Sequence, residues 1–84
     1  MKREEIKSFV TEFIAGTENC NLDPLNIKES ALLKDDLGLD SLDFIELVMK
    51  IEKEYNIGLP DEEASGREND TVRDFVDYVQ SKIE

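Results

Sequence analysis

The side chains best placed for chemistry are Asp40 and Ser41, which stand directly before an apolar-periodic segment. Both residue types are good helix N-caps, so two candidates compete for one cap. If Asp40 caps the helix and Asp43 holds the third helical position, the hydroxyl of Ser41 is left in solvent. A phosphate ester there would lie at the positive end of the helix dipole, beside free backbone N–H groups. Taken alone, however, a Ser or Asp before a helix is usually only a cap.

The element that must position Ser41 is a helix over about residues 41–55, and its apolar residues form two stripes. The first stripe consists of Leu47, Val48, Ile51 and Tyr55, with Phe44 beside it. The second stripe consists of Leu42, Ile45 and Met49, flanked by Asp43 and Glu46. We expect Leu42 and Met49 to be exposed, because an apolar strip bordered by charge suits a partner site. For Ile45, the pattern supports burial in the core and exposure at the surface equally well.

Helical periodicity near both ends of the chain predicts the rest of the bundle. The first helix has an apolar face that consists of Ile6, Phe9, Val10, Phe13 and Ile14. The last helix follows an N-cap at Thr71 and aligns Val72, Phe75, Val76, Val79 and Ile83. Residues 59–64 favour a short helix, and residues 65–70 indicate a polar connector. The expected fold is therefore all-α, with three main helices, one short helix and a long first loop.

That long first loop runs from Thr17 to Asp40 and has no clear period. Long structureless loops are uncommon in compact domains, so we expect a short helical turn and apolar anchors within it. The expected anchors are Leu22, Leu25, Ile27, Leu32, Leu33 and Leu37.

Composition narrows the function classes. The chain has 84 residues, the length of a single domain (1–84), with a formal charge of -11 from 21 Asp plus Glu against 10 Lys plus Arg. Such a charge disfavours nucleic acid and anionic membranes, and favours basic partners. No segment predicts a signal peptide or membrane insertion. One cysteine, Cys20, fits a reducing compartment and indicates a spare thiol, since the chain has no His to activate it. We expect a cytoplasmic monomer.

A longer motif decides between the two interpretations of Ser41. The run Asp36-Leu37-Gly38-Leu39-Asp40-Ser41-Leu42-Asp43 resembles the D-L-G-x-D-S-L-D attachment motif of acyl carrier proteins. The resemblance continues through Glu46-Leu47-Val48-Met49 and Leu59-Pro60-Asp61-Glu62-Glu63-Ala64. It is close from about Ala31 to Ala64, and outside that range it is limited to helix pattern and spacing.

The resemblance implies a carrier without catalysis of its own. A phosphopantetheinyl transferase would move 4'-phosphopantetheine from coenzyme A onto Ser41, and the arm would hold acyl intermediates of fatty acid or related biosynthesis as thioesters. Synthases, acyltransferases or ligases with basic docking patches would be the partners. The positions implied for partner contact are Asp40, Leu42, Asp43, Ile45, Glu46, Met49, Glu52, Glu62 and Glu63. The candidates for an acyl-binding cleft are Phe44, Val48, Leu59 and Ala64.

Three features depart from the family pattern. Leu33 stands where many members have Phe, which alters the anchoring of the first loop. The connector at residues 65–70 is longer than usual and lacks an apolar residue that often packs into the bundle. Phe44 replaces a small polar residue, so we expect long acyl chains to be admitted poorly.

The residues bear on four alternative functions. An enzyme is disfavoured because no Ser or Cys has an evident base beside it. A calcium loop around Gly38 is disfavoured because Leu33 and Leu37 stand where oxygen ligands are needed. A third alternative is an acidic module that binds a basic partner and carries no prosthetic group. Charge and fold are compatible with it, and only the attachment motif argues against it. A specialised polyketide, peptidyl or aminoacyl carrier is the alternative within carriers.

Overall fold

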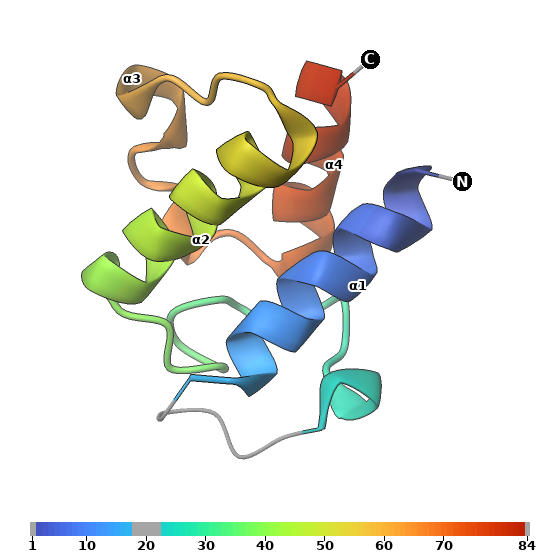
Figure 1. Cartoon of the computed structure of the whole chain (residues 1–84). Helices are drawn as coiled ribbons and strands as arrows, with labels where there is room; N and C mark the ends of the chain where they lie inside the picture. The colour runs from blue at the N-terminus through green and yellow to red at the C-terminus, as the bar shows by residue number, and fades with distance from the viewer. Residues whose placement is uncertain (1, 18–22, 84) are drawn as a thin grey trace.

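The computed structural model describes residues 2–17 and 23–83, and these residues form a helical bundle. The described helices are α1 (Lys2–Ala15), α2 (Ser41–Tyr55), α3 (Asp61–Ala64) and α4 (Val72–Ile83), with 3-10 turns η1 (Pro24–Asn26) and η2 (Arg67–Asn69). α1 and α2 run side by side in opposite directions, and α4 packs against α1 (Figure 1). The predicted all-α fold, with three main helices and one short helix, is confirmed. Cys20 and Leu22 lie outside the described residues.

The apolar faces predicted from periodicity meet in one core. On α1, Ile6, Val10 and Ile14 are fully buried. On α2 and α4, the fully buried side chains are Leu47, Ile51, Val72, Phe75, Val76 and Val79. Each such side chain contributes about 1.5–3 kcal/mol by leaving water, so this core is the main source of stability.

Two aromatic contacts fix α2 against its neighbours. Phe44 packs edge-on against Phe75 of α4, with ring centroids 5.5 Å apart. At the other end of α2, Tyr55 packs edge-on against Phe9 of α1, with ring centroids 6.0 Å apart. Because one contact lies near each end of α2, the orientation of the helix that begins at Ser41 is determined by the core.

A charged cluster joins the start of α1 to the first loop and to α4. Arg3 lies 2.6 Å from Oε1 of Glu29 and 3.0 Å from Oδ1 of Asp77, and Lys7 lies 3.4 Å from Oε2 of Glu29. The hydrogen bond from Arg3 lowers the pKa of Glu29 below its ordinary value. The cluster therefore holds three segments together without adding to the apolar core.

The first loop is anchored by only some of the residues predicted. Ile27, Leu33 and Leu37 are buried, and the predicted helical turn is present as η1, where Asp23 accepts a hydrogen bond from Leu25 N–H at 3.2 Å. Leu25 was predicted as an anchor, and this was wrong, since its side chain is 94% exposed. The turn of η1 directs Ile27 inward instead, which leaves Leu25 on the outside.

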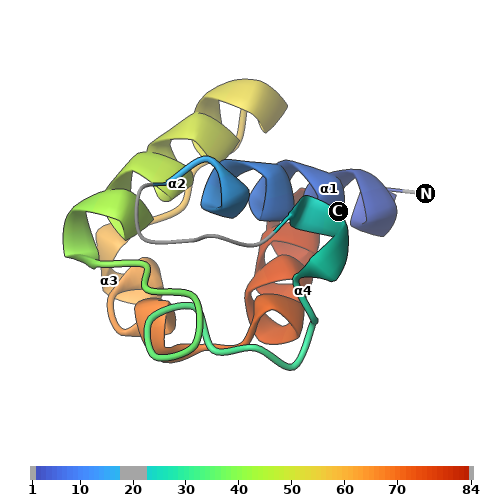
Figure 2. The same ribbon diagram turned by 90° about the horizontal axis from the view of Figure 1, so that it is seen from below.

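The connector before α4 is more ordered than the sequence predicted. It contains η2, and it pairs with the first loop through Leu33 N–H to Asp70 O at 2.9 Å and Lys34 N–H to Glu68 O at 3.1 Å. In the view from below, these two segments lie side by side (Figure 2). Arg67 also lies over the ring of Tyr78, 4.0 Å from its centroid. The polar connector is therefore part of the folded bundle.

Within the described ranges, no helix has the length and apolar character needed to span a membrane.

Candidate functional site

The start of α2 is shaped by a tight loop on one side and by a cap on the other. Leu37 and Leu39 are buried, Gly38 between them adopts φ of 73°, and Leu39 N–H donates to Leu33 O at 3.0 Å. This geometry places Asp40 at the N-cap, where its Oδ1 accepts a hydrogen bond from Asp43 N–H at 2.8 Å. Of the two candidates for the cap, it is Asp40 that caps the helix.

Because Asp40 supplies the cap, Ser41 is left free at the first helical position. Its side chain is exposed, and its hydroxyl makes no hydrogen bond to any residue that the structure describes. The backbone N–H groups of Ser41 and Leu42 likewise have no acceptor among those residues. A phosphate ester on this hydroxyl would meet open N–H donors and the positive end of the helix dipole. The position therefore fits the phosphopantetheine that the motif implies.

An apolar strip lies on the outer face of α2 beside Ser41. Leu42 is 72% exposed, Met49 is 61% exposed and Ile45 is 52% exposed. The two equally supported alternatives for Ile45 are thus resolved in favour of exposure. Asp40 and Glu46 are also exposed, and Asp43 is half-buried. The strip therefore has the composition of a contact surface, apolar at its centre and acidic at its edge.

A surface groove with a volume of about 410 Å³ extends from Ser41 between α2 and the segment that follows α3. Its lining consists of Ser41, Phe44, Ile45, Val48, Met49, Glu52, Ala64, Ser65 and Glu68. The α2 wall is mostly apolar, whereas Ser65 and Glu68 make the opposite wall polar. The groove can therefore hold a short chain attached at Ser41.

The predicted cleft residues divide between this groove and the core. Phe44, Val48 and Ala64 line the groove, whereas Leu59 is buried outside its lining. Sequence reasoning missed Ser65 and Glu68, which were included in a polar connector. No local pattern marks them, because η2 is held in place by bonds to the distant first loop.

Two of the acids predicted for partner contact already have partners in the fold. Oε2 of Glu52 accepts a hydrogen bond from Leu59 N–H at 2.8 Å, which fixes the segment after α2. Glu63 forms an ion pair with Lys82, and the hydrogen bond from Lys82 lowers the pKa of Glu63. Glu62 is exposed. Docking roles for these three acids stay predictions.

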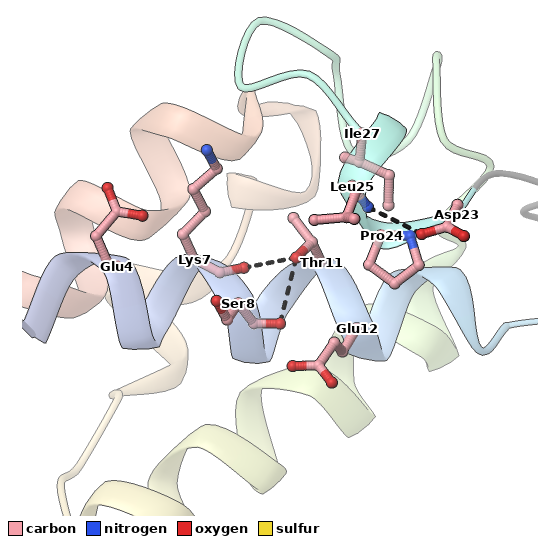
Figure 3. Close-up of a pocket in the computed structure, with 9 residues that line it drawn as sticks. All are labelled: Glu4, Lys7, Ser8, Thr11, Glu12, Asp23, Pro24, Leu25 and Ile27. Atoms are coloured by element: carbon pink, nitrogen blue, oxygen red, sulfur yellow. Dashed lines mark hydrogen bonds between the residues drawn. The ribbon is translucent and has the colours of Figure 1, made fainter.

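A second hollow lies between α1 and η1 (Figure 3), and no residue of α2 lines it. Thr11 in its wall is held locally, since its hydroxyl donates to Lys7 O at 2.9 Å and lies 3.2 Å from Ser8 O. None of the predicted site residues lines this hollow. Across the described part of the chain, no group of three or more His, Cys, Asp or Glu residues is arranged to hold a metal ion. The groove beside Ser41 therefore remains the candidate site.

Comparison with known proteins agrees with this geometry. The family described as "Phosphopantetheine attachment site" matches residues 9–79. The mitochondrial acyl carrier protein of Neurospora crassa is 40% identical over 82 residues, which are 98% of this chain and 59% of that protein. The acyl carrier protein of Wolinella succinogenes is 45% identical over 76% of this chain and 82% of its own length.

The alignment with a third relative covers almost the whole length of both proteins. The acyl carrier protein of Chlorobium phaeovibrioides is 39% identical over 98% of this chain and 100% of its own length. The predicted family and the predicted prosthetic group, 4'-phosphopantetheine, are thereby confirmed. The chain belongs to the acyl carrier proteins, the family that holds acyl groups on covalently attached 4'-phosphopantetheine.

Proposed function

We propose that Ser41 is the residue of this chain that bears 4'-phosphopantetheine, and that the chain carries acyl intermediates of fatty acid or related acyl-chain synthesis. The observation that carries the proposal is the free hydroxyl of Ser41, exposed at the first position of α2 because Asp40 makes the cap. When bound, the arm supplies a thiol that holds acyl groups as thioesters. The chain itself supplies the attachment point, the docking surface and the groove.

In the attachment step, Oγ of Ser41 forms a bond to the phosphorus of the phosphopantetheine moiety of coenzyme A. The pyrophosphate bond of coenzyme A breaks, and adenosine bisphosphate leaves with its electron pair. Ser41 has no hydrogen-bonded base among the described residues, so the transferase must accept the hydroxyl proton. The backbone N–H groups at the start of α2 then face the new phosphodiester and favour its negative charge.

Partner enzymes would approach the outer face of α2. Leu42, Ile45 and Met49 supply apolar contact, and the exposed acids Asp40 and Glu46 select basic docking patches. The formal charge of -11 speeds encounter with basic partners, most strongly at low salt. The proposed partners are a phosphopantetheinyl transferase and the synthases, acyltransferases or ligases that use the cargo. We further propose that residues 1–84 act as one cytoplasmic, monomeric carrier domain.

The test is the intact mass of the protein after incubation with coenzyme A and a broad-specificity phosphopantetheinyl transferase. We expect the wild-type chain to gain the mass of one phosphopantetheine and Ser41→Ala to gain nothing. Ser65→Ala is the matched control, because Ser65 lines the same groove, and it should be loaded like the wild type. An unchanged mass for the wild-type chain would reject the proposal and favour an unmodified interaction module.

A further inference from the structure

One carboxylate in the groove has no partner in the fold. Oε1 of Glu68 is buried and has no hydrogen-bond partner among the residues that the structure describes, although Glu68 lines the groove that begins at Ser41. Native structures rarely leave a buried charged oxygen without a donor, because its lost hydration is not replaced. An oxygen of this kind beside a ligand groove is therefore a candidate for contact with the ligand.

The backbone around Glu68 holds its side chain at the groove. The carbonyl of Glu68 accepts a hydrogen bond from Lys34 N–H at 3.1 Å, so η2 is attached to the first loop at this residue. The neighbouring cation, Arg67, lies 3.0 Å from Asp70 and 4.0 Å from the ring centroid of Tyr78. Arg67 therefore pairs with Asp70 and stacks on Tyr78 rather than pairing with Glu68. No described Lys or Arg forms an ion pair with Glu68.

No other side chain that lines the groove donates a hydrogen bond to Glu68 in the described part of the chain. Phe44, Val48 and Ala64 are apolar, and the carboxylate of Glu52 accepts from Leu59 N–H. Among the described residues, the hydroxyl of Ser65 makes no hydrogen bond to Glu68 either. Since none of the described residues donates to this oxygen, a molecule that enters the groove can supply the donor.

We propose that the groove selects acyl groups that carry a hydroxyl or ammonium donor close to the thioester, and that Glu68 accepts the hydrogen bond. This inference rests on the proposed attachment at Ser41 and adds the class of cargo. A plain alkyl chain would fill the apolar wall but leave Oε1 of Glu68 unpaired. A chain with a donor makes the same apolar contacts and also satisfies that oxygen, so the groove distinguishes the two.

The experiment compares three cargoes of nearly equal shape on the full chain. Apo protein is loaded by a broad-specificity transferase from butyryl-, β-hydroxybutyryl- or β-aminobutyryl-coenzyme A, and each product is checked by intact mass. NMR then follows the methyl signals of Val48 and the side-chain carboxyl carbon of Glu68. We expect the ratio of groove-bound to solvent-exposed cargo to be about tenfold higher for the two donor cargoes than for butyryl.

Variants separate the role of Glu68 from general effects of charge. In Glu68→Met the donor cargoes should lose their advantage over butyryl. In Glu54→Met, which removes an exposed carboxylate outside the groove, the advantage should persist. If Glu68→Met does not fold, the wild-type chain still provides a test. The NMR chemical shift of the Glu68 carboxyl carbon should then change with the donor cargoes and not with butyryl.

Three outcomes would overturn the inference. The first is equal occupancy of the groove by all cargoes, and the second is a donor preference that survives Glu68→Met. The third is that the NMR signal of the Glu68 carboxyl carbon has already changed fully when the arm ends in its free thiol, before any cargo is loaded. The last outcome would identify an amide N–H of the arm, rather than the cargo, as the donor. Failure to gain mass would instead reject the attachment at Ser41, so the two failures are distinguishable.

Discussion

The carboxylate of Asp40 accepts a hydrogen bond from the backbone N–H of Asp43 at 2.8 Å, and this contact explains why the next hydroxyl along the chain is free. A serine that capped its own helix would direct its oxygen back to the backbone. Here the cap is made one residue earlier, so the first residue of α2 presents its side chain to solvent. The same bond positions the proposed attachment residue, Ser41, and stabilises the helix that we propose partners contact.

Replacing Asp40 tests the cap. Asp40→Ala should lower the free energy of unfolding by about 1 kcal/mol, because Asp43 N–H loses its acceptor. Urea unfolding followed by circular dichroism measures the change. Asp40→Asn is the matched control and should remain close to the wild type, since its amide oxygen can accept the same bond. Equal stability of Asp40→Ala and the wild type would show that the cap adds nothing.

Replacing Phe44 tests what limits the groove. Phe44→Ala should cost about 3 kcal/mol of unfolding free energy, because the ring is buried against Phe75. The space left would extend the groove, so octanoyl loading should raise the melting temperature of Phe44→Ala more than that of the wild type.

Phe9→Ala supplies the control for Phe44→Ala. It removes a ring that is packed against Tyr55, outside the groove, so it should lower stability without any added gain from octanoyl. An octanoyl effect of the same size in both variants would contradict the proposed role of Phe44.

The exposed strip on α2 can be tested with a pair of leucines. Leu42→Ser should change the free energy of unfolding by less than about 0.5 kcal/mol, because the side chain is 72% exposed. It should lower kcat/KM for transferase loading about tenfold, since an apolar contact at the centre of the docking surface is lost. Leu25→Ser removes a leucine that is even more exposed, at 94%, and that lies in η1 rather than on α2, so this variant should be loaded normally. Equal loading of the two variants would argue against docking on this strip.

The elements that carry a strong local signal were predictable. The helix over residues 41–55 was expected from its apolar period and is observed as Ser41–Tyr55. Thr71 was expected as an N-cap, and its hydroxyl accepts from Asp74 N–H at 3.2 Å. These signals are local because a cap and the residue three positions later are neighbours in both sequence and space.

The features that sequence did not reveal depend on contacts between distant segments. Leu25 and Ile27 are both apolar residues of an aperiodic loop, and only the path of η1 decides which one faces the core. Glu68 lies in a polar run that predicts a solvated face. The side chain is half-buried and its Oε1 is buried, because the bond between the Glu68 carbonyl and Lys34 N–H holds this segment against the first loop, and the sequence carries no signal for that bond.

Acid should reveal the contribution of the cluster around Glu29. Arg3 lowers the pKa of Glu29 in the folded state, so the stabilisation is complete above the ordinary pKa of 4.5 and is lost as the pH falls through the lower, folded value. Glu29→Gln should therefore be less stable than the wild type at pH 7, by at most about 1 kcal/mol. The difference should vanish in more acidic solution. Urea unfolding at several pH values measures it, and a difference that grows below pH 4.5 would contradict the assignment.

The most direct test of the whole account is the position of the arm on the loaded chain. Wild-type protein loaded from coenzyme A is digested, and tandem mass spectrometry locates the added phosphopantetheine. The account predicts a single modified residue, Ser41, the exposed serine that follows the Asp40 cap. Modification at Ser65 or at any other residue would contradict it.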